Sequence, residues 1–276
     1  GLPMSSLDHT LVCANSLTGI GTIDEAVDAL EPQRKPGELS MLTLEIEQAL
    51  EEAKKLLIDA ANSSEATKAE VKEAAEAARA AAEAAAPTRL LFDAAVAVRI
   101  GEIDSASGIV GELRKQAAKP HVQERISGLN PAHMPFLFPE VFLRKEGGFD
   151  VLIGNPPWEK VKTESWRWWA LRDPGLMGLS TAKRDKRIEE LELERPDLVQ
   201  QLEEEKEAVK VLSQVLTSGP WPGIGTGDLD LYKIFAWRNW QLLRKSGSAG
   251  LVLPRGALAA AGTAEWRRTI ISEGTF

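Results

Sequence analysis

The feature that most constrains this chain is the tetrapeptide Asn155-Pro156-Pro157-Trp158, which directly follows an apolar run from Phe149 to Gly154. The apolar run predicts a short buried strand. It ends where neither proline can donate a hydrogen bond to a neighbouring strand. The strand is therefore followed by a stiff loop that carries an amide, a backbone carbonyl and an indole ring. These groups are suited to hold an exocyclic amino group and to cover the flat ring that bears it.

A second apolar run, residues 249–254, also predicts a buried strand that ends at a proline. A helix expected over 229–245, with Asp228 as its N-cap and Gly247 at its C-terminal stop, would cross over between the two strands. Strand, helix and strand of this kind predict an α/β fold with a parallel sheet covered on both faces. The loop at 155–158 would then lie at the carboxyl end of a strand, where open α/β sheets bind ligands.

A long segment between residues 31 and 130 has helical periodicity. Helices are expected over 41–61, 65–86 and 90–100, with Pro87 ending the second of them. The segment predicts a helical hairpin or small bundle inserted into the α/β fold.

Shorter elements are expected around these two regions. A second helical segment, 181–217, is broken at Pro196, and a last helix covers 263–272. A short strand is expected at 10–13, and the Gly-x-Gly of Gly19 to Gly21 is interpreted as a loop.

Composition excludes several classes of protein. The 276 residues include one cysteine, Cys13, which excludes an internal disulfide framework and fits a reducing cytoplasm. The three histidines are scattered, so no metal site is predicted. No run of about 18 uncharged apolar residues appears, so no membrane partner is expected. The net charge of −8 argues against nucleic acid as a partner, but the charge is unevenly distributed, which weakens that argument.

Basic residues alternate with tryptophans directly after the loop. Candidate contacts to a nucleic acid are Lys160, Lys162, Trp166 and Arg167. Cations next to aromatic rings suit phosphate contact together with base stacking. Packing of the tryptophans into the core is an equally good explanation for Trp166 and its neighbours at 168 and 169.

With its preceding strand, the tetrapeptide resembles the catalytic loop of S-adenosylmethionine-dependent amino-group methyltransferases, most closely the gamma-type N6-adenine DNA methyltransferases. The resemblance implies that the Asn155 side-chain oxygen and the Pro156 carbonyl accept the two amino N–H hydrogens of adenine. Pro157 would stiffen the loop, and Trp158 would stack on a base flipped out of the duplex. It also implies a restriction-modification or defence role, with nuclease or specificity regions or subunits outside this chain.

Other segments carry the same resemblance. Residues 9–17 look like the cofactor segment around the third strand of the family, which places Asn15 and Ser16 at S-adenosylmethionine; a simple Asx turn is the alternative for Asn15. Residues 227–235 and 250–254 resemble the helix start and the fifth strand. The fold implied is a partial Rossmann-like methyltransferase sheet with large helical insertions. Its core segments would be 1–30, 131–180 and 218–276, and its helical insertions 31–130 and 181–217.

The departures from the family matter as much. No glycine-rich cofactor turn precedes Asn15. The chain is therefore expected to be an internal fragment that binds S-adenosylmethionine weakly or not at all by itself.

Two further hypotheses remain open. The same loop chemistry could serve an amino group in RNA or in a protein glutamine. Alternatively, the chain could be a non-catalytic helical scaffold on a degenerate methylase core.

Overall fold

The computed structural model describes residues 11–35, 38, 40–62, 67–105, 109–224 and 229–275. It is an α/β structure, mostly helical, with a parallel sheet of two strands in the described residues. The strands are β1 (Phe149–Gly154) and β2 (Leu243–Leu251). The α-helices are α2 (Ile23–Leu30), α3 (Met41–Asn62), α4 (Lys68–Arg99), α5 (Val110–Ala117), α6 (Pro120–Leu129), α7 (Met134–Leu137), α8 (Pro139–Phe142), α9 (Ser165–Arg172), α10 (Thr181–Glu194), α11 (Pro196–Thr217), α12 (Leu231–Leu242) and α13 (Ala264–Glu273). Short 3-10 turns are η2 (Pro174–Gly178), η3 (Arg255–Leu258) and η4 (Ala261–Thr263).

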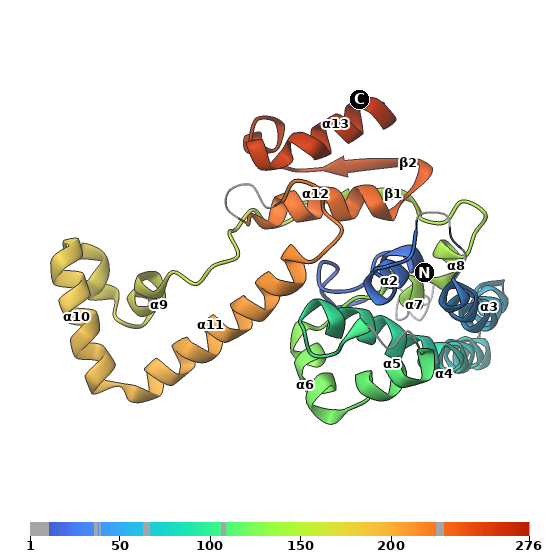
Figure 1. The fold of residues 1–276 in the computed structure, drawn as a ribbon, viewed down its shortest axis with the longest axis horizontal. Coiled ribbons are helices and arrows are strands. Elements are labelled where there is room, and N and C mark those ends of the chain that lie inside the picture. Colours follow the sequence, from blue (N-terminus) through green and yellow to red (C-terminus); the bar gives the residue numbers. More distant parts are fainter. Residues whose placement is uncertain are drawn as a thin grey trace.

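The elements fall into three groups (Figure 1). Helices α2 to α8 form one block, and α12, α13 and the sheet lie together beside it. The long helix α11 runs outward from these two groups to α9 and α10. In the described part of the chain, no helix is both long and apolar enough to cross a membrane.

The largest hydrophobic core lies in the helical block. Helices α3 and α4 pack along each other as the predicted hairpin. Ile46 and Leu50 of α3 and Phe92 of α4 are fully buried there, together with Val27 and Leu30 of α2. This core therefore crosses from the segment before residue 31 into the helical segment after it.

Pro87 does not end a helix, contrary to the prediction. Helix α4 continues through it and absorbs the third helix expected at 90–100. The proline lacks an N–H, but its ring is exposed, and the buried Thr88 hydroxyl donates a hydrogen bond to the Ala85 carbonyl at 2.5 Å. Packing of the following residues, such as Leu91, against α3 and α6 stabilises a helix that local sequence disfavours.

The two strands pair in parallel, as predicted, with Leu152 opposite Ala249 and Gly154 opposite Leu251. The expected cover on both faces is wrong. Val151 is 58% exposed and Ile153 is 86% exposed. The apolar run correctly indicated a strand, but it could not reveal whether other elements cover that strand.

The connection from α12 to β2 is shorter than predicted. The helix ends at Leu242 and the chain passes directly into β2, so Gly247 lies in the strand and not at a helix stop. A Cβ on Gly247 would lie 2.8 Å from the Phe149 carbonyl oxygen, which explains the glycine at this irregular part of the ladder. Asp230 precedes the helix, and the predicted N-cap Asp228 lies outside the described residues.

The predicted strand at 10–13 does not form over its described residues, 11–13. Leu11 is 73% exposed, and the nearest strand-like contact is an isolated bridge from Asn15 to Pro131. The Gly-x-Gly segment is a loop, as predicted. A Cβ on Gly19 would lie 2.0 Å from the Ala132 carbonyl oxygen, so close backbone approach requires the glycine.

A small separate core joins α9, α10 and α11. Trp168 and Trp169 are buried in it against Leu176 and Leu202. The Trp168 indole donates a hydrogen bond to Glu205 at 2.6 Å. Core packing is thus confirmed for these two tryptophans, and neither ring is available to stack on a base. The predicted break at Pro196 is also confirmed, because α10 ends before it and α11 begins with it.

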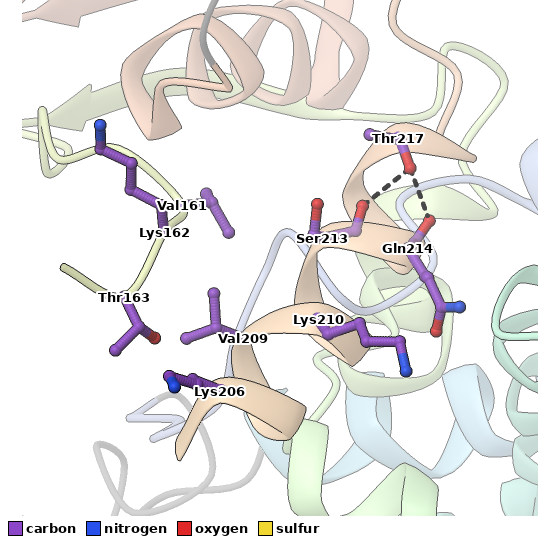
Figure 2. Close-up of a pocket in the computed structure, with 9 residues that line it drawn as sticks. All are labelled: Val161, Lys162, Thr163, Lys206, Val209, Lys210, Ser213, Gln214 and Thr217. Carbon is purple, nitrogen blue, oxygen red and sulfur yellow. Dashed lines mark hydrogen bonds between the residues drawn. The ribbon is translucent and has the colours of Figure 1, made fainter. Parts of the chain in front are cut away.

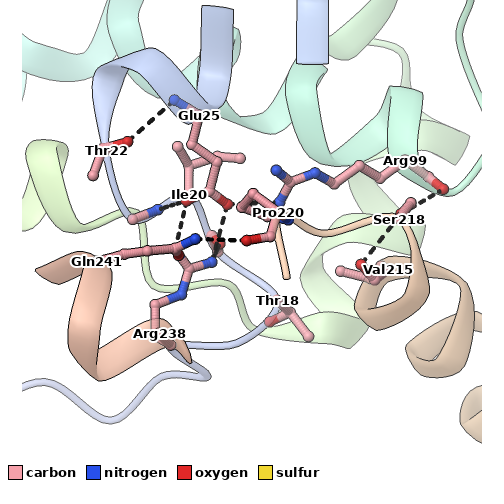
Figure 3. A network of polar contacts seen from close by, with 12 residues as sticks. Thr18, Ile20, Thr22, Glu25, Arg99, Val215, Ser218, Pro220, Arg238 and Gln241 are labelled. Atoms are coloured by element: carbon pink, nitrogen blue, oxygen red, sulfur yellow. Dashed lines mark hydrogen bonds and ion pairs between the residues drawn. The ribbon is translucent and has the colours of Figure 1, made fainter. Parts of the chain in front are cut away.

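A buried ion-pair network ties the helical block to α12 (Figure 3). Glu25 of α2 lies between Arg238 of α12, at 2.5 Å, and Arg99 of α4, at 2.8 Å. Arg238 also donates a hydrogen bond to the Gly19 carbonyl at 2.9 Å. Burial raises the pKa of Glu25, but the two arginines outweigh it and lower that pKa to about 2. The network fixes α12, and therefore the sheet that follows it, against the helical block.

Candidate active site

The loop at 155–158 begins where β1 ends, as predicted. Hydrogen bonds to one residue, Val252, hold both ends of the loop. The Val252 N–H donates to the Gly154 carbonyl at 3.0 Å. The Trp158 indole N–H donates to the Val252 carbonyl at 3.3 Å. Val252 follows β2 directly, so the parallel pairing of the strands sets the position of the loop. Sequence reasoning missed this role because it belongs to the backbone of an ordinary valine.

A second anchor holds the chain just beyond the loop. Residues 159–161 run antiparallel to residues 229–231, with a bridge between Lys160 and Asp230. The Leu231 N–H donates to the Glu159 carbonyl at 2.9 Å, and the Val161 N–H donates to the Leu229 carbonyl at 2.9 Å. Hydrogen bonds therefore fix the loop both to the end of β2 and to the start of α12.

The two acceptors that the amino-group chemistry needs are both unused. Among the described residues, neither the Asn155 side-chain oxygen nor the Pro156 carbonyl accepts a hydrogen bond. Asn155 is exposed, Pro156 is buried and Trp158 is 49% exposed. Together with Pro157 and Glu159, they line an open hollow of about 600 Å³.

The predicted nucleic-acid contacts divide into separate groups. Lys160 and Lys162 lie in the extended segment after the loop. Trp166 and Arg167 lie further on, in α9, where Trp166 packs against the small core. The guanidinium of Arg167 lies 5.4 Å from the Trp166 ring centroid, and that of Arg184 lies 4.4 Å from it.

The partners of these cations are mostly acidic. Lys162 pairs with Glu164 at 3.6 Å, and Arg167 pairs with the same glutamate at 2.6 Å. Since exposed ion pairs contribute about 0–1 kcal/mol, a bound anion could replace the glutamate at either cation. The four residues stay predictions as nucleic-acid contacts.

Asn15 makes the contacts of an Asx turn. Its side-chain oxygen accepts a hydrogen bond from the Leu17 N–H at 3.0 Å. Its own N–H donates to Asn130 and its carbonyl accepts from Ala132. Neither Asn15 nor Ser16 lines the hollow at the loop. The Asx turn that was the alternative for Asn15 is therefore present, and the assignment of Asn15 and Ser16 to S-adenosylmethionine stays a prediction.

The hydrophobic core still brings this segment near the loop region. Leu17 is buried in the same cluster as Trp237 and Trp266, against which Val161 and Leu253 also pack. In the described ranges, no group of three or more histidine, cysteine, aspartate or glutamate side chains could hold a metal ion.

In comparisons with known proteins, no protein-family model, no curated protein and no solved structure matches the chain.

Proposed function

We propose that the loop at 155–158 binds an exocyclic amino group for methyl transfer, with the N6 amino group of adenine in DNA as the acceptor. The observation that carries this proposal is the pair of unused acceptors, Asn155 and Pro156, beside a half-exposed indole at the end of a parallel strand. S-adenosylmethionine is the methyl donor that the sequence resemblance implies.

The amino nitrogen of adenine is a poor nucleophile because its lone pair is delocalised into the ring. Two acceptors placed on its two N–H bonds favour a tetrahedral nitrogen and direct the lone pair away from the loop. Asn155 supplies one acceptor and the Pro156 carbonyl the other. Their contribution is orientation and preorganised hydrogen bonding, without a general base.

Trp158 supports the same role for the loop. Its hydrogen bond to the Val252 carbonyl fixes one edge of the indole, and about half of the side chain remains accessible. A fixed, partly exposed aromatic ring is suited to stack on a base that has left the duplex. Adenine combines such a flat ring with an exocyclic amino group, which favours it over the side-chain amide of glutamine.

The test is transfer of a tritiated methyl group from S-adenosylmethionine by the protein expressed from its intact gene, offered unmethylated DNA, RNA and protein in parallel. We expect N6-methyladenine in DNA, and a loss of at least about 100-fold in Asn155→Ala, because that variant lacks one of the two acceptors. Gln200→Ala, which removes an exposed amide on α11, is the matched control.

Label in RNA or protein alone would contradict the choice of DNA. Label in DNA that is unaffected by Asn155→Ala would contradict the role of the loop.

A non-catalytic scaffold is the second candidate function, and two observations favour it. The Asn15 side-chain oxygen is used in an Asx turn, and the largest core belongs to the helical block and not to the sheet. Unchanged biological activity of Asn155→Ala in the intact protein would support the scaffold.

A further inference from the structure

A second hollow lies just beyond the loop, between the extended chain and helix α11 (Figure 2). Its volume is about 440 Å³. Figure 2 shows one wall built from the segment after the loop and the other from side chains of α11. The residues that define this lysine cleft are Val161, Lys162, Thr163, Lys206, Val209 and Lys210.

Three lysines line the lysine cleft, and no acidic residue is among the described residues of its lining. Each lysine pairs with a glutamate outside that lining, and Lys162 pairs with Glu164 at 3.6 Å. Lys206 pairs with Glu203 at 2.7 Å, and Lys210 pairs with Glu207 at 3.1 Å. Such i,i+3 surface pairs are weak, because water screens them and both side chains lose freedom, so a phosphate can compete with the glutamates for the ammonium groups.

A hydroxyl in the opposite wall, which is built from the segment after the loop, lacks a partner. The Thr163 side-chain oxygen is buried, and no hydrogen-bond partner for it exists in the described structure. A buried hydroxyl without a partner is unfavourable, and a phosphate oxygen that accepts a hydrogen bond from it would remove that penalty. Val161 and Val209 give the lysine cleft an apolar part that suits the sugar of a nucleotide.

The lysine cleft also lies within reach of the loop. Val161 is three positions after Trp158, so their Cα atoms are at most about 11 Å apart. Successive phosphates of one strand are spaced about 3.4 Å along a duplex axis. A strand with one base at the loop could therefore place a phosphate of a nearby nucleotide in the lysine cleft.

We propose that the lysine cleft binds a phosphodiester group of the nucleic-acid strand whose base occupies the loop. This inference rests on the proposed function for the identity of that base. It adds Lys206 and Lys210 as strand contacts, alongside Lys162. Both belong to a helix far along the chain, so no local pattern near the loop indicated them.

The experiment measures binding of a fluorescein-labelled single-stranded 20-mer to the 276-residue chain at several salt concentrations. The test variant is Lys206→Gln/Lys210→Gln. The control variant is Lys72→Gln/Lys115→Gln, which removes two exposed lysines that also pair with glutamates, outside the lysine cleft. Thermal melting confirms that both variants fold.

We expect the test variant to bind about tenfold more weakly at low salt, and the control variant to bind like the wild type. The slope of log affinity against log salt should shrink by about 0.7, since one phosphate contact on a single strand contributes about that much. Thr163→Val should weaken binding without changing that slope. Equal binding by test and control variants would overturn the proposal.

Two competitors identify the source of the phosphate. Inorganic phosphate should displace the 20-mer only at much higher concentration, and a 20-mer with uncharged methylphosphonate linkages should bind the wild type and the test variant alike. If inorganic phosphate binds as tightly as the strand, and only with the lysines present, the site takes free phosphate and the strand assignment is wrong.

The same variants separate this proposal from the proposed function. If lysine-dependent binding is observed but methyl transfer does not require Asn155, the lysine cleft stands and the proposed function fails. If methyl transfer requires Asn155 while the lysines have no effect, only the lysine cleft fails.

Discussion

At the scale of single residues, Glu25 is the centre of the buried ion-pair network. Glu25 is buried between Arg238 and Arg99, and its carboxylate is the shared counter-charge of both buried guanidinium groups. Removing one partner from such a group leaves the others buried without compensation. The Gly21 N–H also donates to Glu25, and a Cβ on Gly21 would lie 1.9 Å from the Arg238 guanidinium.

Replacing Glu25 by Gln should lower the free energy of unfolding by about 3–5 kcal/mol, because both arginines lose their buried counter-charge. Urea denaturation followed by circular dichroism measures it. The matched control is Asp28→Asn, which removes an exposed carboxylate from its ion pair with Arg34 and should cost less than about 1 kcal/mol. A similar cost for both variants would contradict this description of the network.

The pKa of Glu25 predicts a loss of stability in acid. Its value of about 2 in the folded state lies below the ordinary value of 4.5. The ion pairs therefore stabilise the fold fully above about pH 4.5, and the stability is lost as the pH falls toward 2. Over that window the loss should be about 3 kcal/mol. Urea titrations at pH 5, 4 and 3 measure it, and a flat profile would contradict the lowered pKa.

His133 adds a second pH dependence at milder pH. Burial lowers its pKa, although a hydrogen bond to Asp93 at 3.1 Å acts in the opposite direction. The Ile20 N–H donates to the other ring nitrogen, which fixes the neutral ring. Because the unfolded chain takes up the proton first, stability should begin to fall as the pH drops below about 6.5. His133→Gln, which does not titrate, should flatten the thermal melting profile between pH 7 and 5.

At the scale of elements, α4 shows tertiary packing prevailing over a local signal. Pro87 should end a helix, yet the core contacts on both sides of it keep α4 continuous. The penalty at this exposed position should still be present in the folded state.

Pro87→Ala should therefore raise the free energy of unfolding by about 1–3 kcal/mol, as the helix regains a hydrogen bond. Ala82→Gly, at another exposed position of α4, should lower it by about 1 kcal/mol. Both effects are measurable by thermal denaturation. A destabilised Pro87→Ala variant would show that the proline stabilises the helix or the packing around it.

In the sheet, the apolar sequence of β1 predicts a buried strand, but the structure exposes it. Ile153 reads as a core residue but is 86% exposed, so Ile153→Thr should change stability by less than about 0.5 kcal/mol. Leu50→Ala, in the fully buried face of α3, should cost about 2–5 kcal/mol. A loss above about 2 kcal/mol for Ile153→Thr would contradict the exposed strand.

These elements show what the sequence alone could predict. Periodicity and prolines located α3, the break between α10 and α11, and the strand β1 with its loop, because those signals are local. The exposed face of β1 and the continuity of α4 could not be predicted, because both depend on which distant residues pack nearby. For the same reason Val252 and the lysines of α11 were missed at the candidate site.

At the scale of the whole molecule, the residues that line the hollow at the loop and those that line the lysine cleft are separated along the chain only by Lys160. The Glu25 network holds α12 against the helical block, while hydrogen bonds from Leu231 and Val252 hold the loop against α12 and β2. The proposed function requires a rigid loop whose two acceptors can accept hydrogen bonds from an amino group without rearrangement.

The most direct test of that claim is a double-mutant cycle between Asn155 and the amino group of the substrate. It compares the affinity of wild type and Asn155→Ala for a thymidine strand that contains one adenine, and for the same strand with purine, which lacks the amino group. In the wild type, loss of the amino group removes two hydrogen bonds, each contributing about 0.5–1.5 kcal/mol, and should weaken binding about fivefold to 100-fold. In Asn155→Ala only the Pro156 carbonyl still accepts from the amino group, so its loss should weaken binding by only about threefold to tenfold. An equal loss in both proteins would contradict the claim that Asn155 accepts a hydrogen bond from the amino group.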